Sequence, residues 1–465
     1  MIESKINTEI AILGGGPSGY IAAIRASQLG SNVVLIEEKD IGGVCLNKGC
    51  IPTKALLKTS EVSYTIKKSK EFGIESNILN TNWNVCNERK NRVVKSLNIG
   101  LNDLLPAKGI KILKGKGYIK NSKKIIVSTS EGEVEVSTEK IIITTGARPL
   151  IPDIKGINLN GIITSNEALN LTEIPKNIVI IGAGAIGLEF ATMFNSVGSK
   201  VTIIEMKNKI LPYEDNETSN ELLKIMKRQG ITFKLSSSIK EIRQAEDGLR
   251  VIYCQKDKES SIFCEKILVA IGRKLNSDSE EFKNLGINIE NGVIVVDENM
   301  ETNIKGIYAA GDVIGGKLLA HLAFIEGKVS AENALGIKSR VNYNAVPACV
   351  YTNPEVASIG INEDDAKKLG IEIKIGHFNF RNNGRALTLG EREGFVKIIV
   401  DKDNTIIGAQ ILGINASEMI SEVTLAITLK AKANVLADMI HPHPSLSEAI
   451  WEACADAVGR SLSKL

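Results

Sequence analysis

The pattern of apolar and polar positions repeats itself once along the chain. In its first copy, the apolar run Ile10–Leu13 leads into a glycine-rich turn, a stretch with helical periodicity that stops at Gly30, and a second apolar run closed by Glu37. The second copy occupies residues 177–205, has the same order and ends at Glu205. Short apolar runs predict buried strands, and the 3.6-residue period predicts a helix between them. Each copy is therefore predicted to form a strand–turn–helix–strand unit of a parallel α/β sheet.

The glycines of the two turns have the spacing of a dinucleotide-binding fingerprint. They are Gly14, Gly16 and Gly19 in the first copy and Gly182, Gly184 and Gly187 in the second. The first glycine allows the tight turn, the second lets a pyrophosphate approach the backbone, and the third permits close packing of helix on strand. In both copies the acid follows the third glycine by 18 positions (37 − 19 and 205 − 187), where it can accept hydrogen bonds from ribose hydroxyls. A single match is also compatible with a tight turn alone, whereas two matches in the same context predict two nucleotide sites.

The remaining apolar runs indicate that the second unit is inserted into the first. Each glycine unit is followed later by an apolar strand that ends in glycine, at Gly146 for the first and at Gly272 for the second. Alternating segments between these strands, such as 123–137 and 232–242, are typical of antiparallel strands. The chain is thus expected to return to its first domain after completing the second.

The last part of the chain has a different character. A further apolar strand directly precedes Gly311 and Asp312, and after about residue 341 no nucleotide fingerprint recurs. That final section mixes strand-like runs with amphipathic helical stretches, which predicts a separate α+β domain. The expected division is residues 1–148 with 272–341 for the first nucleotide domain, 149–271 for the second, and 342–465 for the α+β domain.

Composition and charge narrow the function classes without deciding among enzymes. The 465-residue chain has a formal net charge of +3, no basic block and only 4% aromatic residues, which disfavours a nucleic-acid-binding protein. Two apolar runs, 10–24 and 178–188, are shorter than the roughly 20 residues that a membrane span needs. The N-terminus lacks a signal-peptide pattern, and the seven cysteines are too scattered for a secreted disulfide scaffold. We therefore expect a cytoplasmic protein that does not enter a membrane.

Cys45 and Cys50 stand out among the cysteines. They lie in the segment GGVCLNKGCIPTK, which follows the first glycine unit directly. Thiols that close on each other across so short a loop in a reducing compartment suit a redox-cycling disulfide better than a structural one. A zinc site is one alternative, although no second pair at ligand spacing lies nearby, and two inert buried cysteines are the other. The inert interpretation is preferred for the remaining cysteines, which are Cys86, Cys254, Cys264, Cys349 and Cys454.

A histidine near the C-terminus is the candidate general base. His443, in HPHPSLSEAIWEA, is followed five positions later by Glu448, and Pro444 is expected to fix the start of a helix between them. A histidine held by a carboxylate is the usual form of a general base near neutral pH. His441 has Leu446 at the same offset, so only one of the two histidines has a carboxylate at this spacing. A capping or surface role for this segment is the alternative.

The chain resembles the pyridine nucleotide–disulfide oxidoreductases along essentially its whole length. The resemblance is carried, in family order, by GGGPSG, GGVCLNKGCIPTK, GAGAIGLEF, YAAGDV, YTNPEVASIG and HPHPSLSE. It implies an α/β fold with two Rossmann-like dinucleotide-binding domains, in which the NAD domain is inserted in the FAD domain, and a C-terminal α+β dimerisation domain.

The same resemblance implies a role for each candidate residue. FAD would be held by Gly14, Gly16, Gly19, Glu37, Lys54, Gly117, Thr145, Gly146, Gly311, Asp312 and Ala320. NAD would be held by Gly182, Gly184, Gly187, Glu189, Glu205 and Gly272, and no metal site is implied. Cys50 would be the thiol against the flavin and Cys45 the thiol that exchanges with substrate, while His443, supported by Glu448, would take the proton from the dithiol.

Within the family, the resemblance is to members that oxidise protein-bound dihydrolipoamide with NAD⁺. The implied partners are a second copy of the chain, in a homodimer with shared sites, and a lipoylated acyltransferase or glycine-cleavage H protein. Glu205 favours NAD, because relatives that use NADPH have arginines in this region. Two alternatives stay open: an NAD(P)H-dependent reductase of another small disulfide, and a flavoprotein scaffold without disulfide chemistry, although Cys45, Cys50 and His443 are all present.

Overall fold

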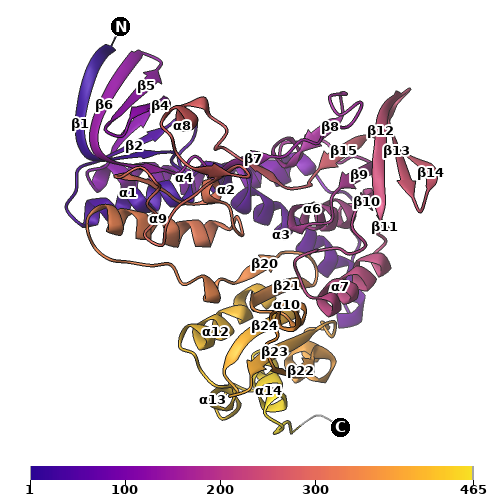
Figure 1. Ribbon diagram of the computed structural model, residues 1–465. Helices are drawn as coiled ribbons and strands as arrows, with labels where there is room; N and C mark the ends of the chain where they lie inside the picture. The colour runs from indigo at the N-terminus through magenta and orange to yellow at the C-terminus, as the bar shows by residue number, and fades with distance from the viewer. Residues whose placement is uncertain (1, 463–465) are drawn as a thin grey trace. The chain divides into compact units, whose positions relative to one another are not determined.

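The computed structural model describes residues 2–462, which belong to two compact units (Figure 1). The first unit contains the residues up to Ala55 together with Asn87–Leu150 and Gly272–Val341. The second contains Leu56–Cys86, Ile151–Ile271 and the chain from Asn342 onward. Helices α3 (Cys50–Lys68) and α4 (Trp83–Ala107) have residues in both units.

The first unit holds the first glycine-rich turn. Its strands are β1 (Ile2–Leu13), β2 (Val33–Glu37), β3 (Lys111–Lys114), β4 (Lys116–Asn121), β5 (Lys124–Thr129), β6 (Gly132–Ile143), β7 (Ala147–Pro149), β16 (Arg273–Leu275), β17 (Ile289–Glu290), β18 (Val293–Ile294) and β19 (Ile307–Ala309). Its complete helices are α1 (Pro17–Gln28), α2 (Gly43–Lys48), α8 (Glu280–Asn284), η2 (Asp312–Ile314) and α9 (Ala320–Ala334).

The main sheet of the first unit has the order β3-β2-β1-β6-β5-β4, with β19 paired to β6. Strand β1 pairs in parallel with β2 and β6, whereas β5 pairs antiparallel with β6 and β4. Ile10 and Ile12 pack in one buried cluster with alanines of α1, and Ala11 and Leu13 pack in another with residues of β4 and β5. Because both faces of this strand are covered, its sequence is continuously apolar. The strand is longer than the apolar run, since its polar beginning also pairs with β6.

The second unit holds the second glycine-rich turn and the C-terminal part of the chain. Its strands are β8 (Ile162–Thr164), β9 (Asn177–Ile181), β10 (Lys200–Ile204), β11 (Thr232–Lys234), β12 (Ser237–Ala245), β13 (Gly248–Gln255), β14 (Lys258–Cys264), β15 (Lys266–Val269), β20 (Ala348–Val350), β21 (Glu355–Gly360), β22 (Ile373–Asn379), β23 (Phe395–Asp401) and β24 (Ile406–Gly413). Its helices are η1 (Ser69–Phe72), α5 (Ser165–Ala168), α6 (Ala185–Ser196), α7 (Asn216–Arg228), η3 (Tyr343–Ala345), α10 (Glu363–Leu369), η4 (Phe380–Asn382), α11 (Gly384–Thr388), α12 (Ala416–Thr428), α13 (Ala433–Ala437) and α14 (Glu448–Ala457).

The described residues of the second unit form three sheets. A parallel sheet has the order β11-β10-β9-β15-β8, an antiparallel sheet the order β12-β13-β14, and a C-terminal antiparallel sheet the order β20-β21-β24-β23-β22. The expectation of antiparallel strands throughout 232–242 is wrong for Thr232–Lys234, which pairs in parallel with β10. Phe233 in β11 packs against the buried cluster of the parallel sheet. Burial of this ring favours the pairing of β11 in parallel at the edge of that sheet, beside β10. The C-terminal sheet packs against α12 and α14, as an α+β domain requires.

A buried ion cluster joins α7 to the C-terminal sheet within the second unit. The side chain of Lys397 is 1% exposed, and its Nζ lies 2.6 Å from Glu363 Oε1, 2.7 Å from Glu217 Oε2 and 3.1 Å from Asp215 Oδ2. His377 Nε2 lies 3.1 Å from the other oxygen of Glu217. The cluster therefore ties the chain that follows β10 to β22 and β23.

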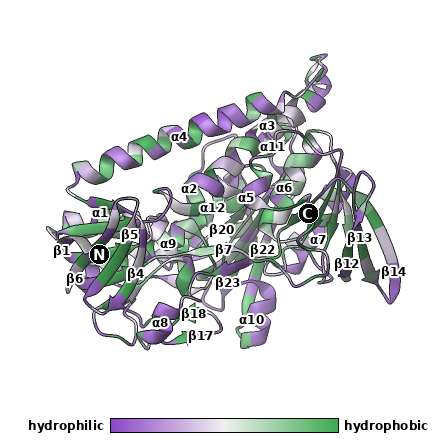
Figure 2. Ribbon diagram, turned by 90° about the horizontal axis from the view of Figure 1, so that it is seen from above, coloured by the Kyte–Doolittle hydropathy of each residue, from purple (hydrophilic) through white to green (hydrophobic). Residues whose placement is uncertain are grey.

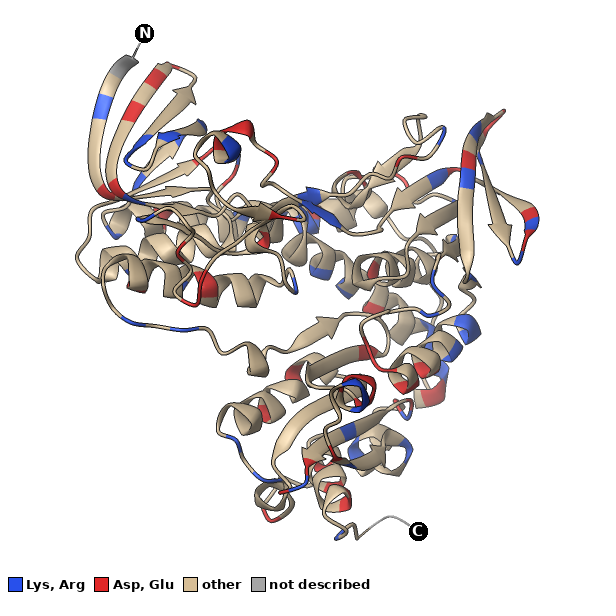
Figure 3. Cartoon of the chain, in the orientation of Figure 1, with Lys and Arg blue, Asp and Glu red and all other residues tan. Residues whose placement is uncertain are grey.

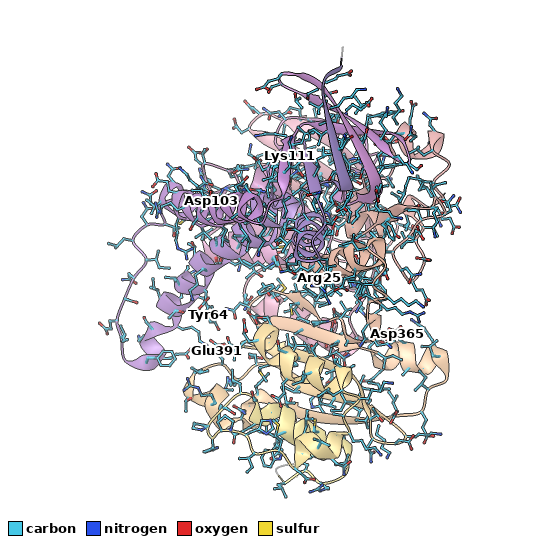
Figure 4. The ribbon with its side chains drawn as sticks, turned by 90° about the vertical axis from the view of Figure 1, so that its left-hand side faces the viewer. Arg25, Tyr64, Asp103, Lys111, Asp365 and Glu391 are labelled. Carbon is cyan, nitrogen blue, oxygen red and sulfur yellow. The ribbon has the colours of Figure 1, made fainter. Side chains whose placement is uncertain are left out.

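A second ion pair in this unit fastens α3 to the same C-terminal region. Lys68 Nζ lies 3.1 Å from Glu391 Oε1 and 5.0 Å from the centre of the Tyr64 ring. Tyr64 and Glu391 are labelled in Figure 4. The ammonium group is thus held between a carboxylate and an aromatic face, two environments that both favour a cation.

The distribution of hydropathy and charge agrees with the pattern read from the sequence. Helix α4 alternates between hydrophobic and hydrophilic residues along its length (Figure 2). Basic and acidic segments are interspersed along both units (Figure 3). None of the helices within residues 2–462 combines the length and the apolarity that a membrane crossing demands.

Candidate active site

The turn between β1 and α1 leaves room for a phosphate group. Gly14 has a φ of 110°, which L-residues with a side chain rarely adopt. A Cβ on Gly19 would lie 1.9 Å from the carbonyl oxygen of Gly14, so the helix can pack on the strand only with glycine there. A Cβ on Gly16 would have Gly43 Cα, 3.9 Å away, as its nearest neighbour. Gly16 is also the N-cap of α1 and gives no side-chain cap, which leaves helix N–H groups for an anion.

The turn between β9 and α6 repeats this geometry. Gly182 has a φ of 103°, and a Cβ on Gly187 would lie 2.1 Å from the carbonyl oxygen of Gly182. A Cβ on Gly184 would meet nothing within 4 Å, and this residue caps α6 without a side-chain hydrogen bond. Both turns therefore offer open space beside a helix N-terminus, as a dinucleotide pyrophosphate requires.

The two acids are fixed in the same way at the ends of β2 and β10. One carboxylate oxygen accepts the N–H of the residue after the first glycine: Gly15 donates to Glu37 at 2.6 Å, and Ala183 donates to Glu205 at 2.8 Å. The other oxygen accepts the N–H of the residue two positions after the acid itself, Lys39 in the first unit and Lys207 in the second, at 2.7 Å in both. Each carboxylate is thus oriented by backbone donors and retains lone pairs for ribose hydroxyls.

The lysines that follow Glu205 are engaged within their own segment. Lys209 Nζ donates to the carbonyl oxygen of Glu214 and lies 3.2 Å from Asn216 Oδ1. Lys207 Nζ lies 5.3 Å from the centre of the Tyr213 ring. The sequence places both lysines near Glu205, but their ammonium groups have other partners here.

Cys45 lies on α2, and Cys50 is the first residue of α3. Both are free cysteines, and the two side chains are hydrogen-bonded to each other. This hydrogen bond, burial and the charge of Cys50 raise the pKa of Cys45, while the positive charge of Lys54 opposes the shift. A thiol whose pKa is raised reacts more readily when a base takes its proton.

An asparagine brace, which sequence reasoning missed, holds α2 in place. Asn47 Nδ2 donates to the carbonyl oxygens of Ile41 at 3.0 Å and Gly43 at 2.9 Å. Asn98 on α4 donates in turn to Asn47 Oδ1 at 2.9 Å. Because each amide satisfies a fixed partner, the segment that carries Cys45 is tied to the long helix.

The other residues expected around FAD also lie in the first unit. Asp312 follows Gly311 directly after β19, and its Oδ2 lies 3.5 Å from Arg273 Nε. Burial raises the pKa of Asp312, and Arg273 opposes that shift. Thr145 Oγ1 donates to the carbonyl oxygen of Asn276 at 3.0 Å. The further candidates in this unit are Gly117 in β4, Gly146 at a φ of 70°, Lys54 in α3 and Ala320 at the start of α9.

The residues expected around NAD are divided between the units. Gly182, Gly184, Gly187, Glu189 and Glu205 lie in the second unit, whereas Gly272 lies in the first. Glu189 is buried on α6, and its Oε1 accepts the N–H of Tyr351 at 3.1 Å. This contact comes from the loop between β20 and β21, so the C-terminal part of the chain orients the Glu189 carboxylate.

His443 and Glu448 form the expected pair in the second unit. His443 Nδ1 lies 2.8 Å from Glu448 Oε1, and Ser445 N–H donates to Glu448 Oε2 at 2.8 Å. Burial tends to raise the pKa of Glu448, but the hydrogen bonds from Ser445 and His443 outweigh it and lower the pKa. The histidine side chain is 80% exposed, so its ring is available to a substrate. The helix starts at Glu448 rather than at Pro444, because residues 441–447 form an irregular turn.

His441 has a carboxylate partner too, although not at the five-residue offset that pairs His443 with Glu448. His441 Nε2 lies 2.9 Å from Glu422 Oε1, and Nδ1 lies 3.2 Å from the carbonyl oxygen of Met439. Glu422 comes from α12, which brings it beside the histidine across 19 sequence positions. The buried His441 side chain thus has both ring nitrogens occupied, which distinguishes it from exposed His443.

The cysteine pair belongs to the first unit and the histidine pair to the second. Within residues 2–462, no three His, Cys, Asp or Glu side chains gather in a way that could hold a metal ion.

Comparison with known proteins decides the family. Residues 8–327 match the sequence model described as "Pyridine nucleotide-disulphide oxidoreductase", and residues 346–454 match that of its dimerisation domain. The chain belongs to the pyridine nucleotide–disulphide oxidoreductase family. It is similar to the dihydrolipoyl dehydrogenase of Bacillus subtilis (strain 168), with 40% identity over 472 residues that cover 98% of each chain. It is also similar to the dihydrolipoyl dehydrogenase of Geobacillus stearothermophilus, with 40% identity over 457 residues that cover 98% of this chain and 97% of the relative.

A solved structure adds a neighbour with a different printed activity. The HOCl-induced flavoprotein disulfide reductase RclA from Escherichia coli, as its Cu(II) complex, aligns with a TM-score of 0.87 and 30% identity, covering 97% of this chain and 99% of that one. Membership confirms the motif-based resemblance and the α/β architecture with a C-terminal dimerisation domain. The protein is an oxidoreductase of a family that uses FAD and NAD, and the open glycine turns and oriented acids fit these nucleotides.

Proposed function

We propose that the protein catalyses the dihydrolipoyl dehydrogenase reaction. A dihydrolipoyl dithiol carried by a partner protein is oxidised to its disulfide, and NAD⁺ is reduced to NADH with release of one proton. The observation that carries the proposal is the Cys45–Cys50 pair on the segment after the first nucleotide turn, in a chain that is 40% identical to a dihydrolipoyl dehydrogenase over 98% of its length. When bound, FAD supplies the electron transfer between this pair and NAD⁺.

The family resemblance implies distinct roles for the two cysteines in thiol–disulfide exchange. In the oxidised enzyme, substrate thiolate attacks Cys45, so a mixed disulfide forms and the thiolate of Cys50 leaves. The second substrate thiol then attacks the mixed disulfide, which releases oxidised lipoamide and leaves both cysteines reduced. The hydrogen bond from Cys50 raises the pKa of the Cys45 thiol and the positive charge of Lys54 opposes that rise, in the direction that favours the thiolate form of Cys45 in the exchange steps.

His443 is the proposed base for these steps. Its Nδ1 faces the Glu448 carboxylate, so Nε2 is the nitrogen that can accept a proton from the dithiol. The neighbouring carboxylate stabilises the imidazolium that results and fixes the ring orientation. In this proposal His443 accepts the proton, and Glu448 holds the His443 ring in position.

The nucleotide-binding roles are proposed residue by residue. Gly14, Gly16, Gly19 and Glu37 would bind the ADP half of FAD, Asp312 its ribitol chain, and Lys54 would lie beside the ring. Gly182, Gly184, Gly187 and Glu205 would bind NAD, with Glu189 near the nicotinamide. The proposed domains are residues 1–148 with 272–341 for FAD, 149–271 for NAD and 342–465 for the dimer interface.

The proposed assembly is a homodimer in which His443 serves the cysteines of the other chain. The match of residues 346–454 to a dimerisation domain supports a dimer. The proposed macromolecular partner is a lipoylated acyltransferase or glycine-cleavage H protein. The scattered cysteines support action in the cytoplasm.

The activity is tested by steady-state assays with two substrate pairs. Free dihydrolipoamide with NAD⁺ should be turned over rapidly, whereas glutathione disulfide with NADPH should give little turnover. Cys45→Ser should remove the first activity, and Cys254→Ser, at a cysteine on β13 outside the site, should retain it. Turnover of glutathione disulfide in preference to dihydrolipoamide would assign the enzyme to another disulfide.

Shared sites are tested by mixing two inactive variants, Cys45→Ser and His443→Gln, under conditions of proven subunit exchange. A mixed dimer would have both intact residues at one of its two sites, so activity should return. If each His443 serves its own chain, exchange will restore none.

A further inference from the structure

The backbone that precedes Asp312 is held by a side chain that the proposed chemistry does not use. At the end of β19, the Ala310 N–H makes the last hydrogen bond to β6, donating to the Ile143 carbonyl at 3.0 Å. The next N–H, that of Gly311, has passed the end of β6 and donates instead to Glu326 Oε2 at 2.9 Å. A carboxylate thus replaces the strand partner immediately before Asp312.

Close packing of α9 on α1 brings Glu326 to this position. A Cβ on Gly327 would lie 2.2 Å from the carbonyl oxygen of Ser18, so only glycine permits this approach of the two backbones. Ser18 Oγ donates to the carbonyl oxygen of Ala310 at 3.2 Å. The peptide group between Ala310 and Gly311 is therefore hydrogen-bonded on both sides: its carbonyl oxygen accepts from Ser18 on α1, and its N–H donates to Glu326 on α9. Glu326 is 3% exposed, which shields the contact from water.

We propose that Glu326 is a positioning residue for FAD, acting through the Gly311–Asp312 turn. The inference rests on the proposed function, in which Asp312 binds the ribitol chain. Gly311 has a φ of 79°, a backbone conformation open to glycine, and the hydrogen bond on its N–H is one of the contacts that fix its orientation. A hydrogen bond to a carboxylate is stronger than one to a neutral acceptor, and its loss would leave the buried N–H without a partner. Removing the carboxylate would let the turn rotate and move Asp312 away from the cofactor.

The chain offers a matched control on the same helix. Glu332 is also buried, at 4% exposed, and also joins α9 to α1, because its Oε1 accepts a hydrogen bond from Arg25 Nε at 2.8 Å. Arg25 is labelled in Figure 4. Loss of Glu332 would remove a buried carboxylate and an interhelical contact without removing the acceptor of the Gly311 N–H. A purely structural role for Glu326 predicts the same effect for both substitutions.

The experiment measures the dissociation constant for FAD by titrating full-length apoprotein, with thermal unfolding recorded in parallel. Glu326→Leu should weaken FAD binding about tenfold to a hundredfold, and Glu326→Gln, which keeps an acceptor oxygen, should weaken it by less. Glu332→Leu should change the FAD affinity by less than about threefold, even where it lowers the melting temperature as much.

Two results would overturn the inference. One is FAD affinity in Glu326→Leu equal to that of the parent, and the other is equal weakening by Glu332→Leu. If Glu326→Leu does not fold, the test relies on Glu326→Gln. An FAD affinity equal to that of the parent, together with an unchanged visible circular dichroism spectrum of the bound flavin, would then exclude positioning by the Glu326 charge. A parent protein that binds no FAD would instead contradict the proposed function.

Discussion

Replacing Glu205 with glutamine should weaken the discrimination against NADP⁺. Both oxygens of this carboxylate are fixed by backbone N–H groups, at 2.8 Å from Ala183 and 2.7 Å from Lys207. The negative charge therefore cannot turn away from a 2′-phosphate on the adenosine ribose. Glutamine removes the charge and also places an amide N–H₂ where one backbone N–H needs an acceptor, so binding of NAD⁺ should decrease as well.

The size of the effect follows from two like charges in a partly desolvated site. At a separation of about 5 Å and an effective dielectric constant of about 20 to 60, their repulsion is on the order of 1–3 kcal/mol. Lys207 and Lys209 add little compensation, since one ammonium lies over the Tyr213 ring and the other is bonded to Glu214 and Asn216. The ratio of kcat/KM for NADP⁺ to that for NAD⁺ should therefore rise about tenfold to a hundredfold.

The assay is steady-state oxidation of dihydrolipoamide with each nucleotide, for the parent, Glu205→Gln and Lys209→Met. Lys209→Met should leave the nucleotide preference of the parent within about threefold, because its ammonium is directed to its own segment. An unchanged ratio in Glu205→Gln, or comparable efficiency of the parent with both nucleotides, would refute the electrostatic argument.

Three further substitutions test other parts of the structure. His443→Gln should lower the rate of dithiol oxidation about 10²- to 10⁴-fold but leave reduction of the flavin by NADH nearly unchanged in stopped flow; equal loss of both half-reactions would contradict a base role. Lys397→Met should lower the free energy of unfolding by about 3–5 kcal/mol in denaturant titrations, because buried Asp215 loses its counter-ion; an unchanged midpoint would count against this. The hydrogen bond from His377 and the charge of Lys397 lower the pKa of Glu217 to about 2, although burial opposes the shift. The contribution of Glu217 to stability is therefore full above about pH 4.5 and is lost as the pH falls towards 2. Glu217→Gln should flatten the dependence of the unfolding free energy on pH in that window, and an unchanged slope would contradict the expected linkage.

The nucleotide turns could be predicted because their rules are local. Gly14 and Gly182 adopt positive φ, and Gly19 and Gly187 allow no Cβ, so the spacing of glycines in the sequence already contains the geometry. The position of Glu205 at the end of its strand is likewise set by a short count of residues. The pairing of His443 with Glu448 could also be predicted, because the two residues are only five positions apart in the sequence.

Contacts between distant segments could not be predicted in this way. Glu422 reaches His441 only because α12 packs beside the final turn, and Lys397 meets Asp215 only after the C-terminal sheet packs against α7. Glu326 looks like any acid on an amphipathic helix until the close approach at Gly327 is known. Each of these partners is chosen by tertiary packing, which leaves no periodic signal in the sequence.

In the proposed reaction, Cys45 and Cys50 are a redox pair with distinct roles beside FAD. The most direct measurement is the absorption spectrum of the purified enzyme during anaerobic two-electron reduction, with turnover of dihydrolipoamide measured in parallel. The parent should develop a long-wavelength band from thiolate beside flavin, Cys50→Ser should lose that band, and Cys45→Ser should retain a thiolate at the flavin while losing turnover. A Cys45→Ser enzyme that still oxidises dihydrolipoamide at the parent rate would contradict the account.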